Sequence, residues 1–131
     1  TVCNGTAALH IAALAAGLKK GKILWTSPIT FVASANCALY CGAEVDFVDI
    51  DPKSYNMSIH ALEKKLEESK KNGKLPDVVV PVHFAGQSCE MEKIHQLSLR
   101  YGFKIIEDAC LEDICLPESL FQWFHWIILK L

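Results

Sequence analysis

Phe103-Lys104-Ile105-Ile106-Glu107-Asp108-Ala109 is the stretch that decides the fold of this chain. It is a β-branched apolar run that begins after Gly102 and ends in two acids, which is too short for a helix and typical of a strand buried on both faces of a parallel sheet. Ligands of open α/β sheets bind at the carboxyl ends of the strands, so Asp108 is the first candidate for chemistry. The alternative is that Glu107 and Asp108 are solvated loop residues or helix caps.

Runs of strand length recur along the chain, and helical patterns lie between them. The strand-like runs are 22–26, 43–49 and 77–82, and the helical patterns are 7–16, 33–40, 59–71 and 88–101. Residues 43–49 alternate between polar and apolar, which suits a strand near a sheet edge. Repeated strand-then-helix units predict an α/β fold with three layers, a mostly parallel sheet between flanking helices.

Composition limits the classes of function. The 131 residues are 51% hydrophobic, enough for one domain with a real core. A net charge of −2 and a pI near 6.2 offer no basic field to a phosphate backbone, which argues against a nucleic-acid partner. The six cysteines form no C-x-x-C pair, so we expect reduced thiols and a cytoplasmic location.

Three further positions could contact a ligand. Asn4-Gly5-Thr6 precedes a helical pattern, and a helix N-terminus with a small residue and a hydroxyl binds phosphate readily, although the same residues serve as simple N-caps. Phe31 stands between a strand and a helix, where it could stack on a planar ligand or pack into the core. His83 follows a strand at the ligand edge. No second His or Cys lies at a metal-binding spacing beside it, so no metal site is expected.

Four separated motifs together resemble the nucleotide-sugar aminotransferases, a pyridoxal-phosphate-dependent family of the aspartate aminotransferase fold type I. They are Asn4–Leu9, Ser27–Ser34, Pro81–Gln87 and Ile105–Ala109. The amino-acid sequences of the second and third motifs are most similar to those of the family branch that makes a 4-amino-4,6-dideoxy-altrosamine nucleotide sugar. The resemblance implies transfer of an amino group from an amino acid, with glutamate expected, to a keto-sugar nucleotide. It also implies a homodimer.

The resemblance assigns roles to four residues. Thr6 and Ala7 match the positions that hold the cofactor phosphate, and Phe31 matches the aromatic that stacks on the pyridine ring. Asp108 matches the acid that pairs with the ring nitrogen and so keeps the cofactor a strong electron sink. Glu107 belongs to the motif and receives no role.

The end of the chain departs from the family. Leu111 stands where a His or Gln usually follows the acid, and the lysine that carries the cofactor as a Schiff base is absent. Lys130 is the only lysine after Asp108 and lacks the family's Ser-x-x-x-Lys setting, so no residue is assigned as catalytic. The resemblance covers residues 1–110, a partial large domain that binds the cofactor, and 111–131 form an atypical tail that we expect to be poorly packed or disordered.

The chain therefore reads as a fragment of a longer enzyme. It starts at Thr1 without an initiator methionine or a signal-peptide pattern, and its apolar end is shorter than the roughly 20 residues that span a bilayer. We expect no membrane partner and no transaminase activity from the chain alone. The alternatives are a non-catalytic α/β module that binds a phosphate or a nucleotide at Thr6, and a truncated product without function.

Overall fold

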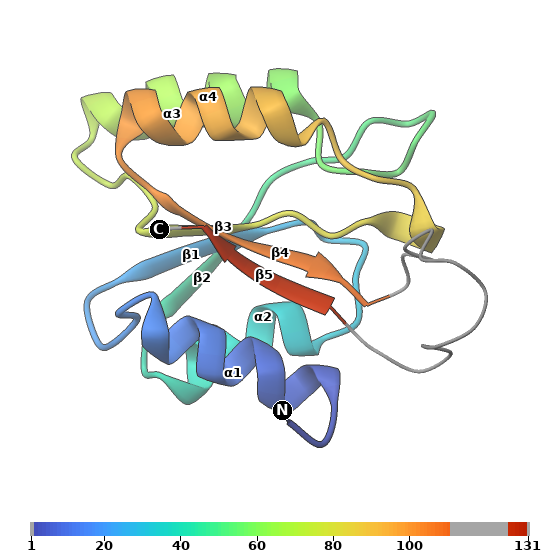
Figure 1. Ribbon diagram of the computed structural model, residues 1–131. Helices are drawn as coiled ribbons and strands as arrows, with labels where there is room; N and C mark the ends of the chain where they lie inside the picture. Colours follow the sequence, from blue (N-terminus) through green and yellow to red (C-terminus); the bar gives the residue numbers. More distant parts are fainter. Residues whose placement is uncertain (1, 111–125, 131) are drawn as a thin grey trace.

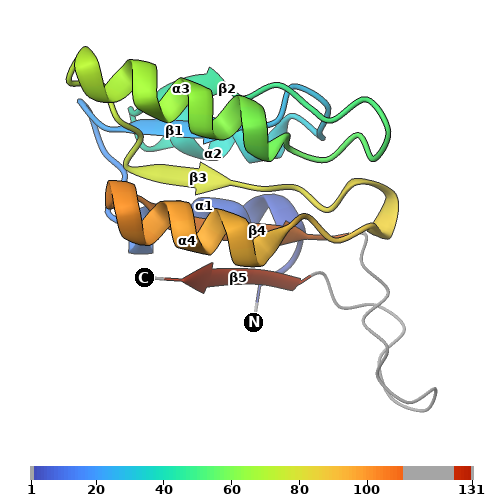
Figure 2. The same ribbon diagram turned by 90° about the horizontal axis from the view of Figure 1, so that it is seen from above.

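A sheet in the order β2-β1-β3-β4-β5 runs through residues 2–110 and 126–130, which are the residues described by this computed structural model (Figure 1). The strands are β1 (Ile23–Thr26), β2 (Glu44–Phe47), β3 (Val78–Val80), β4 (Lys104–Ala109) and β5 (Trp126–Lys130). The pairs β1–β2, β1–β3 and β3–β4 are parallel, and β5 is antiparallel to β4. The prediction of a mostly parallel sheet is confirmed, and β2 lies at an edge as its alternating pattern indicates (Figure 2).

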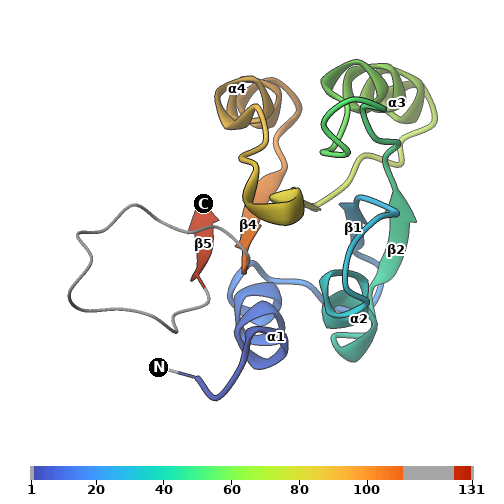
Figure 3. The same cartoon turned by 90° about the vertical axis from the view of Figure 1, so that its right-hand side faces the viewer.

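Helices cover both faces of this sheet. They are α1 (Gly5–Ala15) and α2 (Ala33–Tyr40) on one face, and α3 (Ile59–Lys71) and α4 (Met91–Tyr101) on the other (Figure 3). Local signals place their ends: the Ser58 side chain accepts from the Ala61 N–H at the start of α3, and Gly102 ends α4 with a φ of 81°. The predicted three-layer fold is confirmed. Among the described residues, no helix is long and apolar enough to span a membrane.

Alternate residues of the strands enter two separate cores. Val78, Val80 and Ile106 pack with the residues of α1 and α2, whereas Val79 and Ile105 pack with those of α3 and α4. Both faces are buried, which explains why these strands are continuous apolar runs. Side chains alternate along β4, so the strand sends residue 108 toward the α1–α2 face and residue 107 toward the α3–α4 face. Backbone geometry thus gives the two adjacent acids different environments.

Of the tail that we expected to be poorly packed or disordered, the structure describes Trp126–Lys130, and these residues form β5 rather than a disordered segment. Without β5, the outer side of β4 would be an open edge with unpaired backbone groups, and this apolar segment pairs with it. Lys130 is in register with Ile105, so its backbone lies about 10 Å along β4 from that of Asp108, at about 3.3 Å per residue. Residues 111–125 and 131, including Leu111, lie outside the described part of the chain.

Candidate cofactor site

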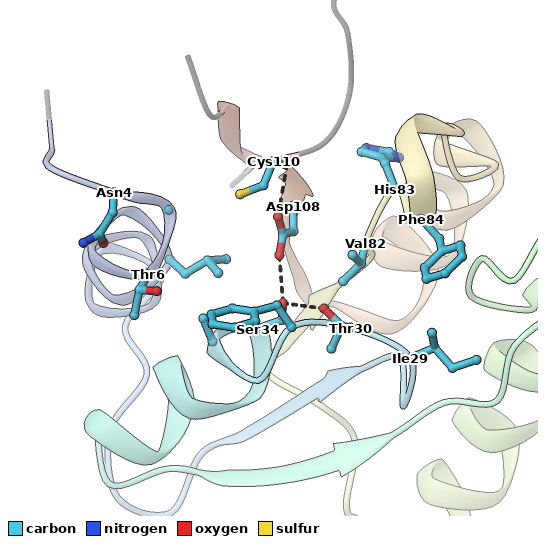
Figure 4. A pocket seen from close by; sticks show the side chains of 14 residues that line it. Asn4, Thr6, Ile29, Thr30, Ser34, Val82, His83, Phe84, Asp108 and Cys110 are labelled. Atoms are coloured by element: carbon cyan, nitrogen blue, oxygen red, sulfur yellow. Dashed lines mark hydrogen bonds between the residues drawn. The ribbon is translucent and has the colours of Figure 1, made fainter. Parts of the chain in front are cut away.

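A cavity of about 620 Å³ opens at the carboxyl ends of β1, β3 and β4, beside the N-terminus of α1 (Figure 4). The residues around it, apart from Cys110, come from the four sequence motifs, and each motif contributes. They are Asn4, Gly5, Thr6, Leu9, Ile29, Thr30, Phe31, Ala33, Ser34, Val82, His83, Phe84, Asp108 and Cys110. Motifs that are far apart in the sequence therefore meet at one site, and that site lies at the predicted edge of the sheet.

Asp108 lines this cavity, and both of its carboxylate oxygens accept hydrogen bonds. Its side chain lines the cavity although the residue is only 5% exposed. Oδ2 accepts a hydrogen bond from Ser34 Oγ at 2.7 Å, and Oδ1 accepts from the Cys110 N–H at 3.3 Å. Its backbone continues the β3–β4 pairing, since Asp108 N donates to Pro81 O and His83 N donates to Asp108 O, each at 3.0 Å. The alternative of a solvated loop residue or a helix cap is therefore wrong for Asp108.

The N-terminus of α1 supplies backbone donors at the cavity. Asn4 is the N-cap, because its Oδ1 accepts from the Ala7 N–H at 2.8 Å. The N–H groups of Gly5 and Thr6 lie in the first turn, where a helix provides no acceptor of its own. Thr6 lines the cavity, so its predicted place beside an anion fits the geometry. Ala7 does not line the cavity and its N–H is already bound to Asn4, so the predicted phosphate contact through Ala7 lacks this support.

Phe31 borders the cavity with an exposed ring. The residue is 75% exposed and precedes α2, which begins at Ala33. The alternative that Phe31 packs into the core is therefore wrong. An exposed ring on a cavity rim is available to a planar ligand.

His83 is a buried histidine with both ring nitrogens engaged. Its Nδ1 accepts from the Cys89 N–H at 2.8 Å, so the ring proton lies on Nε2, which faces Glu107 Oε1 at 3.0 Å. This pairing is the consequence of Glu107 facing the α3–α4 side of β4. No three His, Cys, Asp or Glu side chains of residues 2–110 gather as a metal site.

Asn56 fixes the wall of the cavity that contains Phe84, and the sequence did not indicate this role. Its Nδ2 donates to Gln87 O at 2.8 Å and Ser88 O at 3.1 Å, and its Oδ1 accepts from the Phe84 N–H at 2.9 Å. Ala85 has a φ of 52°, a conformation that L residues seldom adopt. Three hydrogen bonds from one buried amide hold this loop in place.

The Cys110 thiol should react slowly despite lying beside the cavity. Burial, then a hydrogen bond with Asp108 and the charge of that carboxylate, raise its pKa from 9.0 to about 12. Only the thiolate is nucleophilic, and its smaller fraction outweighs the higher nucleophilicity that comes with a raised pKa, so at pH 8 we expect Cys110 to be alkylated at least about tenfold more slowly than an ordinary thiol. Peptide mass spectrometry over time would measure this, with the exposed Cys3 as the internal reference. Asp108→Asn should accelerate the reaction, and equal rates at Cys110 and Cys3 would contradict the expectation.

The cysteines of the described part are free thiols, namely Cys3, Cys37, Cys41, Cys89 and Cys110, and Cys115 lies outside that part.

Comparison with known proteins finds similar sequences over most of this chain. The DegT/DnrJ/EryC1/StrS aminotransferase family matches residues 1–111. EpsN of Bacillus subtilis, named as a pyridoxal phosphate-dependent aminotransferase, is 45% identical over 108 residues, which are 82% of this chain and 28% of that protein. The GDP-perosamine synthase of Caulobacter vibrioides is 38% identical over 106 residues, which are 81% of this chain and 27% of that protein.

A solved structure gives the same result for the fold. The crystal structure of a DegT DnrJ EryC1 StrS aminotransferase from Brucella abortus superposes with a TM-score of 0.79 at 36% identity. The match covers 83% of this chain and 30% of that one. The chain thus spans less than a third of the length of the relatives that it matches.

Proposed function

Because this chain belongs to the DegT/DnrJ/EryC1/StrS aminotransferase family, which depends on pyridoxal phosphate, we propose that it forms the cofactor-binding part of a nucleotide-sugar aminotransferase. The whole enzyme would move an amino group from an amino acid, glutamate in our proposal, to a keto-sugar nucleotide. It would act as a cytoplasmic homodimer. The observation that carries the proposal is that one cavity joins Thr6, Phe31 and Asp108.

The side chains around the cavity suit the parts of this cofactor. The first turn of α1 and the Thr6 hydroxyl would bind the phosphate group, since both donate hydrogen bonds and the helix end carries a partial positive charge. Phe31 would stack on the ring. The Asp108 carboxylate would hold a proton on the ring nitrogen. The bound cofactor would supply an electron sink for transamination.

The lysine that would carry the cofactor as a Schiff base is absent from the residues that line the cavity. None of the lining residues is a lysine, and the backbone of Lys130 lies toward the opposite end of β4 from Asp108. We therefore propose that these 131 residues bind the cofactor reversibly and do not catalyse the transfer by themselves. The altrosamine nucleotide sugar remains our prediction for the product, and this prediction rests only on the amino-acid sequences of two motifs.

Titration with pyridoxamine 5′-phosphate tests the proposal. We expect saturable binding, and pyridoxamine without its phosphate should bind at least about tenfold more weakly, because charge-assisted hydrogen bonds at the α1 N-terminus are lost. Thr6→Ala should weaken binding of the phosphate form about tenfold, and Phe31→Ala by about three- to tenfold. Isothermal titration calorimetry measures each affinity.

Controls separate this proposal from its alternatives. Tyr40→Ala removes another exposed aromatic, which does not line the cavity, and should leave binding unchanged. If inorganic phosphate or a nucleotide bound as tightly as the cofactor, the chain would be a phosphate-binding module without cofactor specificity. A covalent adduct at Lys130, found by mass after incubation with pyridoxal phosphate and borohydride reduction, would overturn the proposed reversible binding.

A further inference from the structure

Two hydroxyl groups extend from Asp108 along the segment that also carries Phe31. Ser34 Oγ lies 2.7 Å from Asp108 Oδ2, and Thr30 Oγ1 lies 2.8 Å from Ser34 Oγ (Figure 4). Ser34 is fully buried in the first turn of α2, and Thr30 lines the cavity. Neither residue received a role from the sequence, although both lie within the motif Ser27–Ser34.

The direction of these hydrogen bonds follows from counting protons. An ionised carboxylate only accepts, so the single hydroxyl proton of Ser34 is donated to Asp108. The Ser34 oxygen can then only accept from Thr30, whose hydroxyl proton points toward it. The series of hydrogen bonds therefore runs from Thr30 to Ser34 to Asp108, and each hydrogen bond polarises the next. Its end is the carboxylate that faces the cavity.

The same short segment fixes both ring contacts of the proposed site. Phe31 follows Thr30 directly, and Ser34 lies three residues after Phe31, in the first turn of α2. Any shift of this segment would move the stacking ring and the hydroxyl that fixes Asp108 together. The other oxygen of Asp108 accepts a longer hydrogen bond, 3.3 Å from the Cys110 N–H, and the Cys110 thiol also hydrogen-bonds to this carboxylate. At 2.7 Å, the hydrogen bond from Ser34 is shorter than the one from the Cys110 N–H, and we take it as the main restraint on how the carboxylate is turned.

We propose that Ser34, supported by Thr30, is a positioning residue that orients the Asp108 carboxylate toward a protonated pyridine nitrogen. This inference rests on the proposed function, because it assumes that a pyridine ring occupies the cavity. It adds to that function by naming the residue that holds the Asp108 carboxylate in the orientation in which it keeps the bound ring protonated. Ser34 itself touches the carboxylate and acts through it.

The protonation of the ring nitrogen is the direct test. Pyridoxamine 5′-phosphate labelled with ¹⁵N in the ring would be bound to the 131-residue chain and followed by NMR between pH 6 and 9. We expect Ser34→Ala to weaken binding about tenfold and to shift the deprotonation of the bound ring nitrogen to lower pH. Thr30→Val keeps the shape of the side chain and should cause a smaller shift in the same direction.

A matched control distinguishes positioning from a general structural role. Thr26→Val deletes another fully buried hydroxyl, which donates to Val80 O at 2.9 Å and does not line the cavity. It should lower stability without moving the ¹⁵N titration. If Ser34→Ala left that titration at its wild-type position, or if Thr26→Val moved it equally, the positioning role would be refuted.

A second measurement needs no cofactor and separates this inference from the proposed function. If the wild-type chain failed to bind pyridoxamine 5′-phosphate, the proposed function would fail for this chain. Three-bond couplings would still report the χ1 rotamer of Asp108 in the free protein. A single rotamer in the wild type that becomes averaged in Ser34→Ala supports the restraint, and averaging already in the wild type would overturn it.

Discussion

Asp108→Asn is expected to weaken the binding of pyridoxamine 5′-phosphate about a hundredfold, because it removes one charge from a desolvated ion pair with the ring. Asparagine has nearly the same shape, and its amide oxygen can still accept from Ser34, so the substitution tests charge rather than packing. Calorimetric titration at pH 7.5 measures the loss. The ring nitrogen of the residual complex should also be less protonated in the ¹⁵N experiment.

The matched control is Asp51→Asn. Asp51 is also an aspartate, but it lies outside this cavity, in a turn where it accepts from the backbone N–H groups of Lys53 and Ser54. Its substitution should leave the affinity within about twofold of wild type, because surface changes of this kind have small effects. An Asp108→Asn protein that bound as tightly as Asp51→Asn would remove Asp108 from the proposed site.

The position of Asp108 could be predicted because only local and directional rules are involved. An apolar run ended by an acid indicates a buried parallel strand, and parallel strands place their carboxyl ends at one edge. The side of the sheet that each acid faces follows from the period of two along β4. The same reasoning places His83 at the same edge as Asp108, whereas Thr6 and Phe31 are joined to Asp108 by the family resemblance.

The partners of Asp108 could not be predicted in this way. Ser34 and Asp108 are 74 residues apart, and their contact depends on how α2 lies against β4. Asn56 likewise reaches a loop 28 to 32 residues further along the chain. A serine in a helix start and an asparagine in a turn have common local uses, so nothing in their own neighbourhood points to these distant bonds.

The pairing of β5 was missed for a different reason. Residues 120–131 are apolar without a clear period, so neither strand nor helix is favoured by the pattern. Its place is decided by β4, whose outer side accepts an antiparallel partner from Ile105 to Ala109. The register of that pairing, rather than any motif, is what sets Lys130 apart from Asp108.

His83→Ala is expected to lower the free energy of unfolding by about 2 to 4 kcal/mol, because it removes a buried neutral imidazole together with the hydrogen bonds at both of its ring nitrogens. The change leaves the Cys89 N–H without its acceptor and takes away the ring that faces Glu107. It also opens space where a fully buried ring stood. Urea unfolding followed by circular dichroism measures the loss, with His95→Ala on the exposed side of α4 as the control.

A comparison of His83→Ala with Glu107→Gln shows why the pair matters to the site. Glu107→Gln keeps an acceptor for His83 Nε2 and should cost only about 1 kcal/mol. Because His83 N donates to Asp108 O, loss of the histidine ring should also loosen the end of β4 and weaken cofactor binding in proportion to the local opening. A stability loss below about 1 kcal/mol for His83→Ala would contradict the ordinary cost of truncating a buried, hydrogen-bonded side chain. If both variants behave as expected, the two acids of β4 differ in role. Asp108 faces the ligand, and Glu107 supports the wall of the cavity through His83.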